Sequence, residues 1–360
     1  MTAQEVLALA HEHGELSEMD LSGLDLSGLD LAETEFSSVV FHNTFFGDAC
    51  LDRASFENCD LTGAIFRNAV LLETSFDGCS GTHIDFHGAD WDAAEIDGCS
   101  FQQADLSCGV MFSCSIDNSD LDGSNVRELV TDKTTFMKTS LAGADLAGAD
   151  MDRMSFMEVV LRGAIMQPCR YSRTLFMKCD LSGQNFSGSS LAGVNFTGCN
   201  MAGADLSEAV LENSLFIGSN LTDAKICDVR ATNSNWQNAV LIRADLERGV
   251  FANSFFNGAD LSLARCSGSD FYGASFSRSL CLSTDMSACR CCYCDFSHAE
   301  LRQTLFTGSN CLGARMHAVK ESRVQWGGAN RLFMSGTDAE LARAESWSPP
   351  EAANARSLDD

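Results

Sequence analysis

The stretch LSGLDLSGLDLAETEF, residues 21 to 36, decides the fold, because a large apolar residue stands at every fifth position. The same spacing continues in one phase to Phe306 and Met316, with no inserted or missing residue. An α-helix repeats near 3.6 residues and a strand near 2, so a strict period of five indicates neither. The pattern predicts one continuous repeat structure in place of separate globular domains.

Each five-residue unit has a fixed internal order around the large apolar residue, which we call position i. Small residues such as Ala49, Ala54 and Ala64 stand at i−2, and Asp or Asn is frequent at i−1. Of the 29 glycines, 22 stand at i+2, where a tight turn favours a residue without Cβ. With i−2 and i inward, one unit forms a short strand and a corner. Four units then close a coil of twenty residues, and identical positions stack between coils.

The stretch AGADLAGADM, residues 142 to 151, resembles the A(D/N)LXX motif of the pentapeptide-repeat family. The resemblance extends over about residues 19 to 330. It implies an all-β fold, the right-handed quadrilateral β-helix, with about 15 coils and short capping helices at both ends. Handedness and the square cross-section come from this resemblance, whereas the period of five comes from the residues themselves.

The boundaries follow from where the period begins and ends. We expect an N-terminal capping helix within residues 1–18, the β-helix over 19–330, a C-terminal cap over 331–347 and a mobile polar tail over 348–360. Capping boxes begin at Thr2 and Thr337, and predict helices over 3–13 and 338–346. We expect the C-terminal cap to cover the last layer with four apolar residues, Leu332, Phe333, Met334 and Leu341. No window is apolar enough for membrane insertion.

The net charge of −26 is concentrated in the first third of the chain. Up to residue 126 there are 24 acidic residues and two basic ones, Arg53 and Arg67, while the remainder has 26 acidic and 22 basic residues. Direct binding to nucleic acid needs a basic surface, so it is not expected as a main function.

The 17 cysteines are predicted to be free thiols in a reducing, cytoplasmic environment, since thirteen stand at inward positions. Two groups have a spacing that suggests metal ligands: Cys289, Cys291, Cys292 and Cys294 with His298, and His83 with His87. In the first group the register places three thiols inside and Cys292 outside, and the second group straddles a corner. We therefore predict no metal, no cofactor and no catalytic site, so the protein is not expected to be an enzyme.

Outward positions are mainly polar, with one exception on the side that carries most of the inward phenylalanines. An apolar stripe occupies i−1 or i+1 there: Met157, Leu175, Met177, Leu215, Ile217 and Phe255. Scattered apolar surface residues are common in monomeric proteins. The alternative is that the stripe binds a protein partner or pairs two copies into a homodimer around a two-fold axis.

These features predict a rigid, non-enzymatic scaffold or adaptor for protein–protein interaction. The opening GELSEMDLSGLDLSGLDLA, residues 14 to 32, also resembles the starts of pentapeptide-repeat proteins associated with bacterial type VI secretion. That resemblance implies an accessory or effector-loading role. Similarity to the fluoroquinolone-resistance group of the family implies an alternative, an acidic DNA mimic that inhibits or protects DNA gyrase. A translocated bacterial effector is a third hypothesis.

Overall fold

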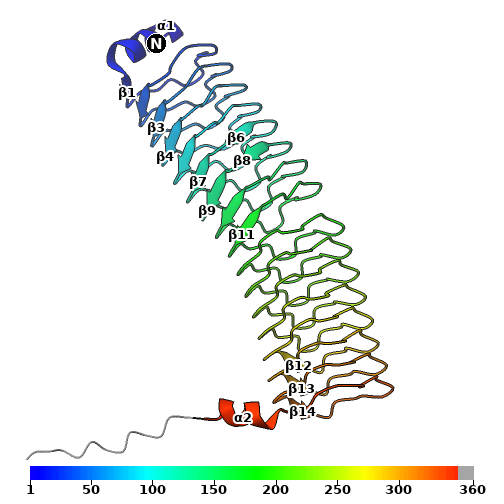
Figure 1. The fold of residues 1–360 in the computed structure, drawn as a ribbon. Helices are drawn as coiled ribbons and strands as arrows, with labels where there is room; N and C mark the ends of the chain where they lie inside the picture. Colours follow the sequence, from blue (N-terminus) through cyan, green and yellow to red (C-terminus); the bar gives the residue numbers. More distant parts are fainter. Residues whose placement is uncertain (348–360) are drawn as a thin grey trace, which may run out of the picture.

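The computed structural model describes residues 1–347, which form a long parallel β-helix of about 15 coils (Figure 1). Helix α1 (Ala3–His13) lies at one end of the rod and helix α2 (Ala339–Glu345) at the other. The predicted fold is confirmed. The expected mobile tail, 348–360, lies outside the described residues. Neither helix within residues 1–347 has the length and hydropathy to cross a bilayer.

Helix α1 covers the first coil, as predicted. The Thr2 hydroxyl accepts a hydrogen bond from the Glu5 backbone N–H at 3.3 Å, and the Glu5 carboxylate accepts one from the Thr2 N–H at 2.8 Å. Gly14 ends the helix in the left-handed region with φ of 72°. Val6 and Ala10, one helical turn apart, are both buried. The helix therefore shields the apolar end of the solenoid from water.

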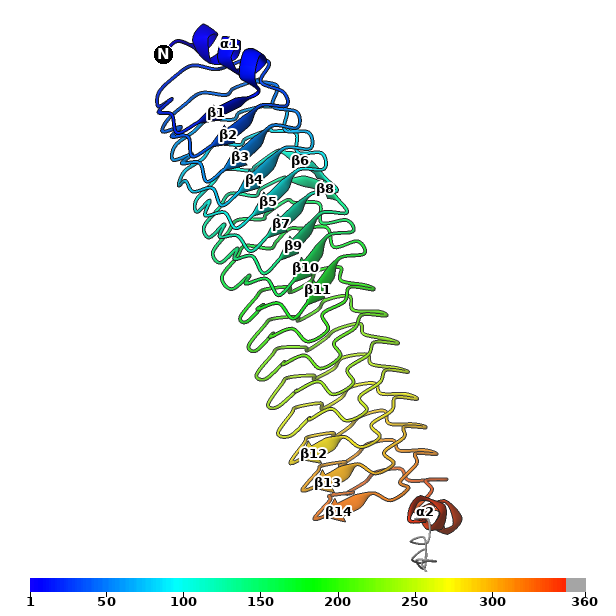
Figure 2. The ribbon, with the colours of Figure 1, turned by 90° about the vertical axis from the view of Figure 1, so that its left-hand side faces the viewer.

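Short parallel strands lie along the sides of the rod, each paired with the residues twenty positions before or after it. They are β1 (Glu15–Ser17), β2 (Glu35–Ser37), β3 (Ser55–Glu57), β4 (Ser75–Asp77), β5 (Glu95–Asp97), β6 (Val110–Phe112), β7 (Ser115–Asp117), β8 (Val130–Asp132), β9 (Thr135–Met137), β10 (Ser155–Met157), β11 (Leu175–Met177), β12 (Leu280–Leu282), β13 (Glu300–Arg302) and β14 (Lys320–Ser322). One nine-stranded sheet, in the order β1-β2-β3-β4-β5-β7-β9-β10-β11, runs down one side (Figure 2). Single bridges continue the same register beyond β11, as far as Arg315 with Ser335.

The core is made by positions i and i−2, and its largest members stack between coils. Behind the nine-stranded sheet, Phe156 stacks on Phe176 with ring centroids 4.9 Å apart, and farther along the same column Trp236 stacks on Phe216 at 4.1 Å. We call this column the phenylalanine ladder. Stacking at the coil spacing buries each ring between its neighbours, so every coil stabilises the next.

Two residues on either side of one corner exchange the usual roles of large and small. Gly81 stands at i, where the pattern places a large residue, and Ile84 stands at i−2, where it places a small one. A Cβ at Gly81 would lie 2.9 Å from Ile84 Cδ1 and 2.8 Å from the backbone carbonyl carbon of Leu61. Ile84, only 1% exposed, therefore fills the volume that a large residue at 81 would occupy.

The C-terminal end differs from the expected cap. The five-residue register continues through residue 335, which places Leu332 at i+1 and Phe333 at i+2, both outward positions, and they are 57% and 79% exposed. Helix α2 begins after Asp338, whose carboxylate accepts from the Glu340 and Leu341 N–H groups, so Asp338 and not Thr337 is the N-cap. No residue of α2 is buried. The helix therefore does not cover the last layer.

Candidate protein-binding face

The six residues of the predicted apolar stripe all lie above the phenylalanine ladder, on a surface that we call the ladder face. Met157 and Met177 are directly paired in β10 and β11. Beyond them, backbone bridges place Leu175, Asn195, Leu215, Asn235 and Phe255 in one column, so that apolar and Asn side chains alternate. The twenty-residue coil thus brings together residues as far apart in sequence as Met157 and Phe255.

The stripe is partly covered by its own neighbours. Phe255 is 48% exposed, whereas the other five residues have intermediate exposure because stacked side chains cover their flanks. Met137 extends the stripe by one coil, since it pairs directly with Met157. Met137 was not among the predicted stripe residues, although its i+1 position twenty residues before Met157 was a sufficient signal. Met137, Met157 and Met177 form a methionine ladder of flexible, polarisable side chains.

On the N-terminal side, the same column continues as carboxylates. Asp117 pairs with Met137, and before it Glu57, Asp77 and Asp97 follow one another in register. We call these four residues the acid column. No Lys or Arg stands at an outward position of the ladder face before Lys138. Two unit charges about 4.8 Å apart, the spacing of stacked strands, repel by about 0.9 kcal/mol in water. The acid column is therefore unfavourable for the rod alone.

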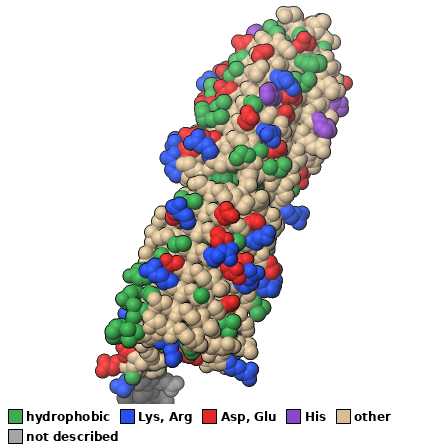
Figure 3. All heavy atoms as spheres, turned by 90° about the vertical axis from the view of Figure 1, so that its right-hand side faces the viewer, with side chains coloured by type: hydrophobic (Ala, Val, Ile, Leu, Met, Phe, Trp, Pro, Cys, Tyr) green, Lys and Arg blue, Asp and Glu red, His purple; other side chains and the backbone are tan. Residues whose placement is uncertain are grey.

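Elsewhere on the rod, carboxylates at outward positions pair with a cation from a neighbouring coil. Arg243 contacts Asp223 and Arg248 contacts Asp228, each at 2.6 Å and twenty residues away. The hydrogen bonds from these arginines hold the pKa of both aspartates below the ordinary value. On the side that Figure 3 shows, away from the nine-stranded sheet, Lys and Arg lie next to Asp and Glu. The acid column departs from this pattern, because no Lys or Arg stands on this part of the ladder face and Asp97 accepts instead from the Asn118 side chain at 2.8 Å.

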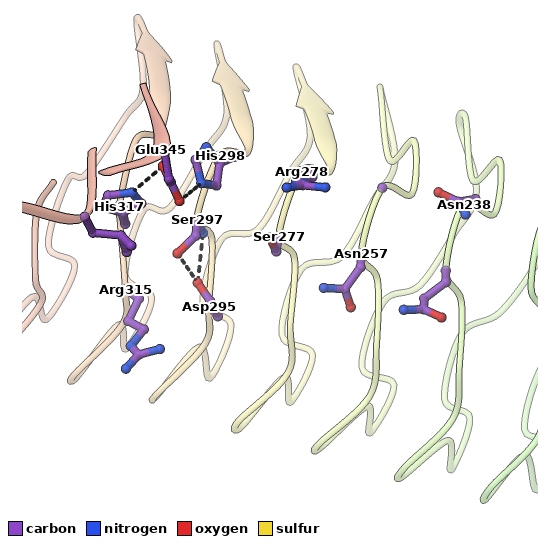
Figure 4. Close-up of a pocket in the computed structure, with 13 residues that line it drawn as sticks. Asn238, Asn257, Ser277, Arg278, Asp295, Ser297, His298, Arg315, His317 and Glu345 are labelled. Atoms are coloured by element: carbon purple, nitrogen blue, oxygen red, sulfur yellow. Dashed lines mark hydrogen bonds and ion pairs between the residues drawn. The ribbon is translucent and has the colours of Figure 1, made fainter. Parts of the chain in front are cut away.

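Towards the C-terminus the ladder face is hollowed into a groove of about 530 Å³, which α2 borders at one end (Figure 4). Its floor is formed by small or amide side chains at i+1 of successive coils: Gln237, Asn257, Ser277 and Ser297. Arg278 and Arg315 flank the floor, and Leu341 and Glu345 of α2 contribute to the end wall. The ladder face thus has three parts in a row: acidic, apolar and grooved.

Glu345 attaches α2 to the groove through two histidines. It accepts hydrogen bonds from His317 Nε2 at 3.1 Å and His298 Nε2 at 3.2 Å (Figure 4). These bonds, with His317 the larger contributor, lower the pKa of the Glu345 carboxyl. His317 is itself almost enclosed, with its side chain 8% exposed. The helix is therefore held beside the last coils and not over their end.

His298, His317 and Glu345 are also ligand types for a metal, and their ligand atoms lie within 4.8 Å of one another. The tautomer of His317 argues against a metal site. The backbone N–H of Asp338 donates to His317 Nδ1 at 3.1 Å, so the neutral ring carries its proton on Nε2, the atom that faces Glu345. In this arrangement the three side chains form a hydrogen-bonded clasp on α2.

The cysteine cluster is arranged for packing. Cys289 and Cys294 each donate to a backbone carbonyl, of Cys266 and Phe271 respectively, at 2.9 Å. Such thiols are protonated, whereas a metal ligand is a thiolate. Cys292 stands at an outward position as predicted, but it is only 5% exposed and therefore less accessible than its register suggested. His87 has a polar neighbour of its own, because its Nδ1 lies 2.9 Å from the Ser107 hydroxyl.

Family models agree with this geometry over most of the repeat. One, described as a pentapeptide repeat region, matches residues 49–126 and 149–226. A second, described as pentapeptide repeats in eight copies, matches residues 15–53, 219–249, 239–278 and 284–320. The chain belongs to the pentapeptide-repeat family. The resemblance of the sequence to the pentapeptide-repeat family is therefore confirmed. No curated protein sequence matches the chain.

Solved structures of other pentapeptide-repeat proteins also match the chain. HetL, from the cyanobacterium Nostoc sp. strain PCC 7120 and involved in heterocyst differentiation regulation, is 19% identical over 71% of this chain and 91% of its own, with a TM-score of 0.22. Full-length QnrB1, a plasmid-mediated fluoroquinolone resistance protein, is 18% identical over 74% of this chain and 96% of its own, with a TM-score of 0.23. A third, from the thylakoid lumen of Arabidopsis thaliana, is 22% identical over 34% of this chain and 68% of its own, with a TM-score of 0.16.

Proposed function

We propose that this pentapeptide-repeat protein is a non-enzymatic scaffold that binds a protein partner along the ladder face. The observation that supports the proposal is the methionine ladder, an outward apolar column on a rod whose exterior is otherwise mainly polar. Apolar surface removed from water contributes roughly 25 cal/mol per Å² to association. A rigid solenoid adds little ordering cost on binding, because its face is already formed.

The proposal is tested by capturing proteins from an extract of the source cells on the immobilised full-length chain. Met157→Asp with Met177→Asp places two charges in the methionine ladder. Ile165→Asp is the matched control, because Ile165 is 52% exposed but lies on a different side of the rod. Proteins captured by the parent and by Ile165→Asp should be lost from the double variant. Equal capture by all three, or capture of nothing, would contradict a ladder-face scaffold.

The acid column supports a second candidate, mimicry of DNA towards a DNA-binding enzyme such as gyrase. Carboxylates repeated along a rod present a row of negative charge to a basic groove. The same capture separates the candidates. Gyrase that is lost with Asp77→Asn and Asp97→Asn, but retained with the methionine variants, would favour mimicry. Secretion-machine components would favour the type VI accessory role, which remains a prediction, as does the translocated effector.

A further inference from the structure

We infer that the ladder face binds an amphipathic helix that lies along the axis of the rod. One half of the length of this helix presents basic residues, and the other half presents apolar residues. The inference rests on the proposed scaffold function and names the chemistry of its partner. The basic half lies over the acid column, towards α1, and the apolar half lies over the methionine ladder and the residues up to Ile217.

The acidic and apolar segments form one column with no interruption between them. Asp117 pairs directly with Met137, so the fourth carboxylate is adjacent to the first methionine. One partner segment that crosses this junction meets both chemistries in a fixed order. Charge complementarity therefore specifies which end of the partner lies towards α1, and apolar burial supplies most of the affinity.

The face offers no backbone groups with which a partner strand could pair. In β11, the Leu175 N–H donates to Met154 O at 2.9 Å, and the Phe176 N–H donates to Asn195 O at 2.7 Å. The backbone hydrogen-bonding groups of this strand are thus taken up on both sides by neighbouring coils, whereas strand addition requires a free sheet edge. A partner must therefore contact this face through its side chains, with its own backbone hydrogen bonds already formed. An α-helix meets both conditions.

The spacing of the column also suits a helix. Stacked strands are about 4.8 Å apart and a helical turn rises about 5.4 Å, so residues three or four apart on a helix meet successive coils. From Glu57 to Ile217 the column crosses eight coil intervals, which at these spacings is about 38 Å, or roughly 26 helical residues. Methionine side chains tolerate the small mismatch because they are flexible and adapt to different apolar shapes.

The test uses two labelled synthetic peptides of about 26 residues, the length given by helical rise over the column. In the first, Lys at helical spacing fills one half and Leu at the same spacing fills the other. The second has the same composition with Lys and Leu interleaved along its whole length. Fluorescence anisotropy with the full chain should show saturable binding of the first peptide, and binding of the second weaker by about tenfold.

Protein variants assign the two halves. Asp77→Asn with Asp97→Asn should weaken the first peptide at least about threefold at low salt and reduce its salt dependence. Met157→Gln with Met177→Gln should weaken it about tenfold and leave the salt dependence unchanged. Asp25→Asn with Asp30→Asn removes the same charge from other sides of the rod, and Ile165→Gln removes apolar surface from another side. Both controls should stay within about twofold of the parent, since their side chains do not face the peptide.

Several results would overturn the inference. Equal binding of the two peptides would show that the order of basic and apolar residues does not matter. An equal loss of peptide affinity with Asp25→Asn and Asp30→Asn would show that the peptide responds to the net charge of the rod and not to the acid column. Sedimentation that shows a dimer of the parent, converted to a monomer by Met177→Asp with Ile217→Asp, would mean that a second copy occupies the face. If extract capture depends on Met157 and Met177 but the peptides bind alike, the scaffold proposal stands and only the helical partner falls.

Discussion

Replacing Ile84 with Ala should destabilise the rod strongly, although Ala is what the repeat motif favours at that position. Ile84 fills the space that Gly81 leaves empty, and its Cδ1 is the side-chain atom nearest to where a Cβ at 81 would lie. Losing three buried carbons at about 0.8 kcal/mol each costs about 2.4 kcal/mol, and the cavity that remains raises the total to about 3–4 kcal/mol.

Val194→Ala is the matched control, because Val194 stands at i−2 and is fully buried, but follows a large core residue, Leu191. Its two carbons predict a loss of about 1.6 kcal/mol. Urea unfolding followed by far-UV circular dichroism gives the apparent free energies. Hydrogen exchange of residues 61–101 reports whether the loss is local, since solenoid coils stabilise their neighbours.

The double variant Gly81→Ala with Ile84→Ala sharpens the test. A Cβ at 81 meets the Leu61 backbone whether or not Ile84 is truncated, so no recovery is expected. If Ile84→Ala costs no more than Val194→Ala, or if Gly81→Ala restores its stability, the compensation argument is refuted.

Two further predictions concern the thiols and the C-terminal helix. All 17 cysteines are free, so titration in denaturant without reductant should return close to 17 thiols, and a clearly smaller total would contradict this prediction. In the native protein the exposed Cys108 should react first, and Cys108→Ser should remove that fast phase. Glu345→Ala should raise hydrogen exchange in residues 339–345, because the clasp on His298 and His317 is lost, and unchanged exchange would contradict the clasp. The folded-state pKa of Glu345 is lowered, so its stabilising contribution is present at neutral pH. The contribution is lost as the pH falls through that lowered pKa, below the ordinary glutamate range. Acid should therefore raise exchange in residues 339–345 as the substitution does.

The sequence by itself determined the repeat, its phase and the N-terminal helix. A solenoid places residues twenty apart in contact in every coil, so a one-dimensional period translates directly into stacked positions. The inward set from Leu21 to Met316 is therefore readable without coordinates, as is the location of the six stripe residues on one side. Even Met137 was available from the period, since its place follows from Met157 by one coil.

Other features depend on volumes and on the path of the chain after the repeat. Gly81 stands where a large residue is expected and Ile84 where a small one is expected, and Cys292 is buried at an outward position. These features arise from local packing, which the position within the five-residue unit does not describe. The period contains no information about where α2 lies. His317 and His298 contact Glu345 across 28 and 47 residues, separations that are not multiples of a coil. Only the tertiary structure decided that contact, because it forms where the repeating geometry ends and side-chain hydrogen bonding, not coil stacking, positions the chain.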